Sequence, residues 1–324
     1  MNNQQIHTSI IITTFNREKN IFELLNLINK QICVLKDTIE IIICDSNSQK
    51  KLSILNYIKQ FSNLRIIYYN CRINHQAYKR NYGIRFSHGK YKIFIDDDCF
   101  PEKNFVYNFL KTLYLNRKKI IYFGLVRYVF FNENKNLIKY RQSRVYNLPN
   151  IKSVPHKNFL TMNMAYNIKA ISRGDIFFSN RFRNYGFEDF EFAYRFKKKS
   201  YKLIQLKSLV YHRDNRDFDN FLKKYNFLGR YGIEDIIKIN LMAAKDLIYY
   251  KIEKNLIVQV FLKVPGIVHI LNFIENIIRF IEKKIPFFLS ILYDVGITAA
   301  YLKGVVSRNY YFKQTNQKRN EWYK

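Results

Sequence analysis

The first hundred residues alternate short β-branched runs with segments whose apolar residues recur at helical spacing. The runs at 9–13 and 39–44 are typical of strands buried on both faces, and further strands are expected at 64–69 and 92–95. The helical spacing predicts helices at 19–32, 48–61 and 74–87. This alternation indicates an α/β fold with a mainly parallel central sheet flanked by helices.

Two of the expected strands end in carboxylates. Asp45 follows the second strand, and Asp96, Asp97 and Asp98 follow the fourth. Ligands of open parallel sheets bind at the carboxyl ends of the strands, so we expect the site there. Three adjacent acids repel one another unless a cation neutralises them, and they therefore favour a divalent metal such as Mn²⁺ or Mg²⁺. The alternative is a cap for a helix starting near Lys103, for which one Asp would suffice.

Two later segments offer further polar groups. Gly186 precedes Glu188 and Asp189, and the residues after them have the spacing of a helix. This pair could do chemistry or could simply stabilise a helix N-terminus, and the residues leave both interpretations open. His212 follows a short apolar strand. A lone histidine is more often structural, but beside the aspartates it could complete an oxygen-rich metal site.

The second half of the chain is less regular and ends in an apolar but interrupted region. Over residues 256–306 the apolar residues are punctuated by lysines and arginines, with no clean apolar run of about 20 residues. This pattern predicts amphipathic helices with basic faces lying on an anionic membrane surface. The alternatives are packing on the catalytic domain or a homodimer contact.

The charge balance is strongly basic. Lys and Arg total 55 against 25 Asp and Glu, a formal net charge of +30 over 324 residues. Such an excess attracts nucleic acid, anionic membranes or phosphorylated small molecules. A nucleic-acid-binding protein would leave the acidic segments unexplained, so we expect no nucleic-acid partner. A catalytically silent scaffold is the other alternative, and the intact acids argue against it.

The cysteines and the N-terminal residues indicate the cellular compartment. Cys33, Cys44, Cys71 and Cys99 form no CxxC pair, so we expect small core residues in a reducing compartment and no zinc site. The first eight residues are polar and lack the apolar stretch of a signal peptide. We therefore expect a cytoplasmic protein, peripheral at the inner face of the cell membrane.

Six segments in this order resemble the motifs of GT-A glycosyltransferases of family 2, over roughly residues 7–215. The segments are Ile12–Glu18, Asp45–Ser48, Lys79–Ile84, Asp96–Asp98, Tyr185–Asp189 and His212. The resemblance is to members that build bacterial cell-surface glycans, with similarity to chondroitin-polymerase and β-1,4-galactosyltransferase-like domains. Ser46 departs from the pattern, because the family more often has an acid or Asn there.

The resemblance implies a domain plan and a reaction. It implies a GT-A domain at 1–225, with a nucleotide-sugar half at 1–118 and an acceptor half at 119–225, followed by a helical extension at 226–324. The implied reaction is inverting, metal-dependent transfer from a nucleotide sugar, by default UDP-hexose or UDP-N-acetylhexosamine. The acceptor would be a hydroxyl of a cell-surface glycan or of a lipid-linked carrier.

The resemblance also assigns roles to single residues. Asp189 would be the catalytic base, and Glu188 would orient the acceptor. The metal would be held by Asp98 and His212, with Asp96 contacting the ribose or the metal. The residues implied to bind the nucleotide sugar are Thr13, Phe15, Arg17, Asp45, Arg80, Asp96 and Asp97.

Overall fold

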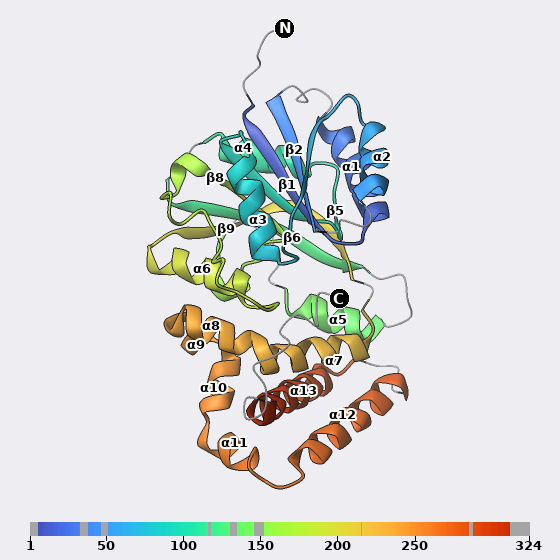
Figure 1. Cartoon of the computed structure of the whole chain (residues 1–324), viewed down its shortest axis with the longest axis vertical. Coiled ribbons are helices and arrows are strands. Elements are labelled where there is room, and N and C mark those ends of the chain that lie inside the picture. The colour runs from blue at the N-terminus through green and yellow to red at the C-terminus, as the bar shows by residue number, and fades with distance from the viewer. Residues whose placement is uncertain are drawn as a thin grey trace. The chain divides into compact units, whose positions relative to one another are not determined.

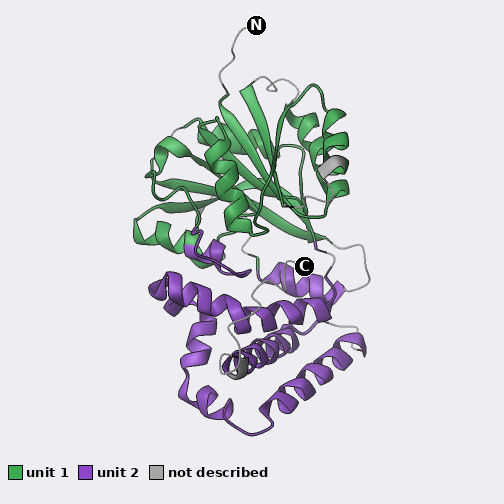
Figure 2. Cartoon of the chain, in the orientation of Figure 1, with its two compact units in different colours: residues 1–129, 145–178, 192–213 green, residues 130–144, 179–191, 214–324 purple. Residues whose placement is uncertain are grey.

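A computed structural model describes most of the chain, and the chain folds into two compact units (Figure 2). The described residues are 6–32, 38–46, 51–115, 118–129, 135–145, 152–214, 216–284 and 288–311. Unit 1 comprises residues 1–129, 145–178 and 192–213, and unit 2 comprises 130–144, 179–191 and 214–324.

The strands of the described residues all belong to unit 1 (Figure 2), and Figure 1 labels most of them. They are β1 (Thr8–Thr14), β2 (Ile39–Asp45), β3 (Arg65–Asn70), β4 (Tyr91–Asp96), β5 (Cys99–Pro101), β6 (Ile120–Val129), β7 (Lys152–Ser153), β8 (Asn163–Asn167) and β9 (Lys202–Arg213).

The helices are divided between the units. In unit 1 lie α1 (Glu18–Ile32), α2 (Lys51–Lys59), α3 (Gln76–Phe86), α4 (Phe105–Leu113) and most of α6 (Glu188–Lys198). In unit 2 lie α5 (Lys135–Ser143), α7 (Phe218–Phe227), α8 (Ile233–Ile239), α9 (Leu241–Asp246), α10 (Ile248–Lys254), α11 (Leu256–Phe261), α12 (Ile267–Lys284) and α13 (Ser290–Tyr311).

The sheet of unit 1 has the order β3-β2-β1-β4-β8-β6-β9-β5, and β7 pairs with β9. The first four strands are parallel, whereas β8 is antiparallel to both of its neighbours. Strands β6 and β9 are parallel, and β5 is antiparallel to β9. The predicted α/β fold is therefore confirmed, and its parallel half is the half that the β-branched runs indicate.

Apolar layers cover both faces of this sheet. Ile10 and Ile12 of β1 belong to one core cluster with residues of α1 and α4, whereas Ile11 belongs to a second cluster with residues of α3 and α6. Successive side chains of a strand point to opposite faces, so a continuous apolar run such as β1 requires helices on both sides. This burial explains why β1, β2 and β4 lack polar alternation.

The segment after the three aspartates is a strand and not a helix. The short strand β5 follows Asp98 directly, and the next helix, α4, begins at Phe105 after the N-cap residue Asn104. The interpretation of Asp96, Asp97 and Asp98 as a helix cap is therefore wrong.

Unit 2 is helical and has cores of its own. One cluster joins Leu137 of α5 and Phe221 of α7 to Ile278 of α12 and Ile297 of α13. Glu275 of α12 is 1% exposed, and its carboxylate pairs with Lys303 of α13 at 2.6 Å. The predicted C-terminal helices are thus confirmed. Within the described residues, no helix combines the length and the apolar character that crossing a bilayer needs.

We expect Gly124→Ala to destabilise unit 1. A Cβ at Gly124 would lie 2.0 Å from the backbone oxygen of Ser208, at the register shift between β6 and β9. Overpacking of this kind costs about 1–3 kcal/mol, which urea denaturation would measure. Gly174→Ala is the matched control, because nothing lies within 4 Å of its Cβ. Equal stability of the two variants would contradict this account of Gly124.

Candidate active site

The carboxyl ends of β1, β2 and β4 meet at one edge of the sheet. In the strand register Thr13 lies opposite Asp96, and Thr14 lies opposite Asp45. β1 pairs with β2 on one side and with β4 on the other, which creates the switch point where ligands of open α/β sheets bind. Asp45 and Asp96 thus both lie at this carboxyl edge, on either side of β1.

Asp96 ends β4 and is held by a buried arginine. Nη2 of Arg80, on α3, donates to both carboxylate oxygens of Asp96 at 3.0 and 3.2 Å, and the hydroxyl of Thr13 donates at 3.4 Å. The side chain of Arg80 is 3% exposed and its guanidinium lies 5.4 Å from the centre of the Phe178 ring. A buried guanidinium with a fixed orientation neutralises Asp96.

Asp97 and Asp98 share the guanidinium of Arg17, in the turn after β1. Nη1 of Arg17 donates to Asp97 at 2.8 Å and to Asp98 at 2.6 Å, and the hydroxyl of Thr14 donates to Asp97 at 2.7 Å. Burial raises the pKa of Asp97 to about 6 even though Arg17 favours the charged form. The two carboxylates raise the pKa of Arg17 in turn, although burial opposes them.

Asp98 also faces His212 of β9. Nε2 of His212 lies 3.3 Å from Oδ1 of Asp98, and the backbone N–H of Arg213 donates to the Asp98 carbonyl at 2.8 Å. Burial alone would raise the pKa of Asp98, but the attraction of His212 and Arg17 holds that pKa well below its usual range. Asp98 and His212 thus offer a charged oxygen and an imidazole nitrogen at one place, which fits a divalent cation.

Asp45 is fully buried at the end of β2. Its Oδ2 accepts a hydrogen bond from the hydroxyl of Tyr68 on β3 at 2.8 Å, and its carbonyl accepts from the backbone of Cys71 at 2.5 Å. Burial and the neighbouring Asp45 raise the pKa of Tyr68, so its hydroxyl stays a donor. Phe15 lies in the turn that follows β1.

Glu188 and Asp189 lie at the start of α6 and belong to unit 2, whereas the aspartates after β4 belong to unit 1. Glu188 is buried, and its Oε2 accepts from the backbone N–H of Gly186 at 3.0 Å. Gly186 has φ +115°, a conformation that favours glycine. Asp189 is half-buried in the first turn of the helix. The chemical roles assigned to this pair stay predictions.

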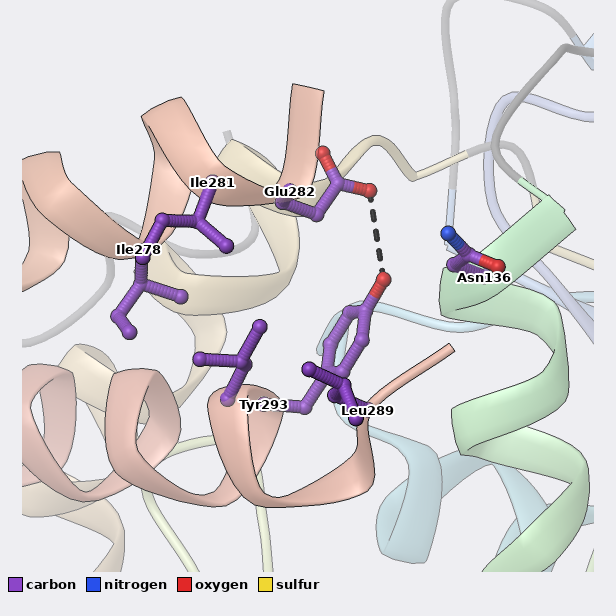
Figure 3. Close-up of a pocket in the computed structure, with 7 residues that line it drawn as sticks. Asn136, Ile278, Ile281, Glu282, Leu289 and Tyr293 are labelled. Carbon is purple, nitrogen blue, oxygen red and sulfur yellow. Dashed lines mark hydrogen bonds between the residues drawn. The ribbon is translucent and has the colours of Figure 1, made fainter. Parts of the chain in front are cut away.

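Two cavities lie among the helices of unit 2. The first has a volume of about 10 Å³, and Figure 3 shows Tyr293 and Glu282 in its wall, joined by a hydrogen bond of 3.4 Å. It has room for about one water molecule and none for a sugar nucleotide. The second has a volume of about 300 Å³ and is lined mainly by apolar side chains of α11, α12 and α13, among them Phe261, Leu271 and Val295.

Sequence comparison identifies the family. Residues 9–182, more than half of the chain, match the family described as glycosyl transferase family 2. The chain belongs to this family. It therefore has the GT-A fold and a glycosyltransferase domain, as the ordered motifs predict.

A curated relative and several solved structures are similar to this glycosyltransferase. The relative is the dolichyl N-acetyl-α-D-glucosaminyl phosphate 3-β-D-2,3-diacetamido-2,3-dideoxy-β-D-glucuronosyltransferase of Methanococcus voltae, 27% identical over an alignment of 215 positions that covers 62% of this chain and 65% of the relative. The chain thus spans just under two thirds of that relative.

The solved structures show the same fold. Residues 1–349 of S. aureus TarS, in complex with UDP-GlcNAc, superpose with a TM-score of 0.51 and 16% identity, covering 96% of this chain and 93% of that one. The mannosyltransferase PcManGT from Pyrobaculum calidifontis, in complex with GDP-Man and Mn²⁺, gives a TM-score of 0.60 and 13% identity, covering 96% and 89%.

The motif-based prediction gives no role to some residues of this site, although one of them, Lys79, lies within the matched segment Lys79–Ile84. Lys79 is buried on α3 and its Nζ donates to the Thr14 carbonyl at 3.0 Å and to Asn74 at 3.1 Å; burial lowers its pKa. Tyr68, described above as the partner of Asp45, is another. The sequence signal for Lys79 is its place beside Arg80 in the expected helix. Asn47 and Ser48, which complete the motif after Asp45, lie outside the described residues.

Proposed function

We propose that this protein is a metal-dependent, inverting glycosyltransferase that transfers a sugar from UDP-hexose or UDP-N-acetylhexosamine. The acceptor is a hydroxyl of a cell-surface glycan or of a lipid-linked carrier. The observation that carries the proposal is the separation of 3.3 Å between Asp98 Oδ1 and His212 Nε2 at the edge of the sheet where strands β1, β2 and β4 end.

Asp98 and His212 would hold Mn²⁺ or Mg²⁺, with Asp96 near the ribose or the metal. When bound, the cation neutralises the diphosphate and favours departure of the nucleoside diphosphate. Arg80, already paired with Asp96, suits a phosphate oxygen through its planar guanidinium. Arg17 bridges Asp97 and Asp98 and would bind the donor beside them.

The nucleobase would bind against the ends of β1 and β2. Thr13 and Phe15 would contact the base, and Asp45 would accept a hydrogen bond from a ring N–H. The hydroxyl of Tyr68 donates to Oδ2 of Asp45 and so fixes the orientation of this carboxylate at the end of β2.

Asp189 would act as the base. It would take the proton from the acceptor hydroxyl while the hydroxyl oxygen bonds to C1 and the bond from C1 to the diphosphate breaks on the opposite face. Glu188 would orient the acceptor segment, because its carboxylate fixes the backbone at Gly186.

The names of the similar proteins support this choice of substrates. The M. voltae relative is named for transfer to a dolichyl-phosphate-linked sugar, and TarS was solved with UDP-GlcNAc. PcManGT was solved with GDP-Man and Mn²⁺, so a guanosine donor is the competing choice.

A screen of nucleotide sugars tests the proposed donor and metal together. We expect a UDP-sugar with Mn²⁺ to raise the melting temperature and to be hydrolysed slowly, and EDTA to abolish both effects. Asp98→Ala should lose the metal-dependent part of the stabilisation and should retain the fold by circular dichroism. Undiminished turnover in excess EDTA, or the same stabilisation in Asp98→Ala, would contradict the metal site; a response to GDP-sugars alone would contradict the uridine donor.

The role of Asp189 is tested by Asp189→Asn, which keeps size and shape but cannot accept the proton. We expect kcat to fall by about 100-fold or more with the KM for the donor little changed. The matched control is Asp246→Asn, at an exposed acid of α9. If Asp189→Asn lowers the melting temperature and leaves kcat unchanged, the pair only stabilises the start of α6.

We also propose that unit 2 binds an anionic membrane surface, where a lipid-linked acceptor would be found. Large apolar side chains are exposed along α11, α12 and the turn between them: Leu256, Ile257, Val260, Phe261, Val264, Ile270, Phe273, Ile277 and Phe280. The last four recur at intervals of three and four residues, so they lie on one face of α12.

The charges around this face are basic. Lys254, Lys263, Lys283 and Lys284 are exposed near it. The two acids of α12 are bonded within unit 2: Glu275 is buried against Lys303, and Glu282 accepts a hydrogen bond from the hydroxyl of Tyr293. An apolar face flanked by exposed cations complements an anionic leaflet.

Surface substitutions test the membrane proposal better than truncation does, because α12 and α13 share a core with α5 and α7. Phe273→Ser with Phe280→Ser should weaken binding to phosphatidylglycerol-containing vesicles by more than about tenfold, since each buried phenylalanine contributes about 1.5–3 kcal/mol. Tyr107→Ser, at a 60% exposed residue of α4, is the control. If the wild-type protein does not bind these vesicles, the proposal is contradicted. It is also contradicted if the wild type is a dimer that the double variant converts to a monomer.

A further inference from the structure

A cysteine thiol lies beside the proposed metal ligands. β5 pairs with β9 in antiparallel register, with Cys99 directly opposite His212. Directly opposite residues of an antiparallel pair project their side chains from the same face of the sheet. Sγ of Cys99 lies 3.7 Å from Oδ1 of Asp98, and ligand atoms of Asp98, Cys99 and His212 all lie within 4.8 Å of one another.

We propose that Cys99 is a third protein ligand, so that the site binds a thiophilic divalent ion, Zn²⁺ or Co²⁺, in the absence of the donor. This inference rests on the metal site proposed above and adds to it a sulfur ligand and a different preference among metals. Mn²⁺ and Mg²⁺ favour oxygen ligands, whereas Zn²⁺ and Co²⁺ also bind thiolate and imidazole ligands well.

Two of the three ligand separations are close to those of a tetrahedral site. Zinc binds carboxylate oxygen and imidazole nitrogen at about 2.0–2.2 Å and thiolate sulfur at about 2.3 Å, so neighbouring ligands are roughly 3.3–3.6 Å apart. The separations found are 3.3 Å between Asp98 Oδ1 and His212 Nε2 and 3.7 Å between Asp98 Oδ1 and Cys99 Sγ. The ligand atoms of all three residues lie within 4.8 Å of one another, so a bound ion would draw the side chains closer together.

The surroundings of His212 also favour a ligand role. Its side chain is 6% exposed, with Nε2 beside the Asp98 carboxylate, and a buried imidazole held in one orientation is suited to ligate a metal ion. In this structure the imidazole is oriented by Asp98 through Nε2 and by its packing on Tyr128, with ring centres 5.0 Å apart.

Binding is balanced by release of a proton. The thiol of Cys99 loses its proton to solvent as the sulfur–metal bond forms, so no oxidant or further reactant is required. The competing role for Cys99 is a small apolar residue, since it is fully buried within the core cluster of β1, α1 and α4. The two roles predict different absorption spectra for the metal-loaded protein, because only a thiolate ligand gives a sulfur-to-metal charge-transfer band.

The test is a titration of the metal-free, full-length protein with Co²⁺ in the absence of donor. We expect a thiolate-to-cobalt charge-transfer band in the near ultraviolet, present in the wild type and in Cys71→Ala and lost in Cys99→Ala and Cys99→Ser. Cys71 is the matched control because it is also buried and free. X-ray absorption of the cobalt-loaded wild type should show one sulfur neighbour, which requires no variant.

Affinities separate this inference from the proposed function. Removing a residue that hydrogen-bonds to a metal ligand lowers metal affinity by about 10–100-fold. Removing a ligand itself should cost at least as much, so Cys99→Ala should weaken Zn²⁺ binding by at least about tenfold and leave Mn²⁺ binding unchanged. Cobalt bound without a sulfur band, or a band that persists in both Cys99 variants, would overturn the thiolate ligand and leave the Asp98 and His212 site standing. Failure of the wild type to bind any divalent ion, both without and with a UDP-sugar, would overturn both.

Discussion

Three carboxylates crowded at the end of one strand must be neutralised, and the neutralising groups come from separate parts of unit 1. Arg80 of α3 pairs with Asp96, Arg17 from the turn after β1 bridges Asp97 and Asp98, and His212 of β9 faces Asp98. Each of these contacts requires a particular strand neighbour or helix docking. The order of strands around β1 and β4, and the pairing of β5 with β9, therefore serve one electrostatic requirement.

The parallel half of the sheet could be predicted from sequence because its signal is local. Strands such as β1 and β2 are buried on both faces, and that burial favours a short run of consecutive apolar residues, Ile10–Ile12 in β1 and Ile41–Cys44 in β2. The mixed half gives no such signal. β8 lies between β4 and β6, and the amide of its Asn163 donates to the carbonyls of Leu125 and Ser208, at 2.9 Å each. These partners are distant in the chain, and neither periodicity nor composition reveals them.

The acids, the histidine, Arg17 and Arg80 could likewise be picked out as motifs, but the roles of Tyr68 and Lys79 could not. Tyr68 donates to Asp45 across the neighbouring strand, and Lys79 reaches the Thr14 carbonyl from α3. Cys99 was expected to be a core residue, and it is buried, as are Cys44 and Cys71; Cys33 lies outside the described residues. The closeness of Cys99 to His212 follows from the β5–β9 register, which no local sequence pattern encodes.

The discontinuous second unit has a consequence for synthesis of the chain. The apolar face of α5 packs against α7, α12 and α13, and Tyr140 bonds to Asp294, 154 residues later in the chain. The ribosome synthesises α5 long before α13. Until the last helix emerges, the side chains of Leu137 and Tyr140 are therefore exposed to water or held in a temporary contact. Non-local closure of this kind slows folding and exposes apolar surface meanwhile. The nascent protein is therefore most vulnerable to aggregation between completion of the sheet at β9 and arrival of α13.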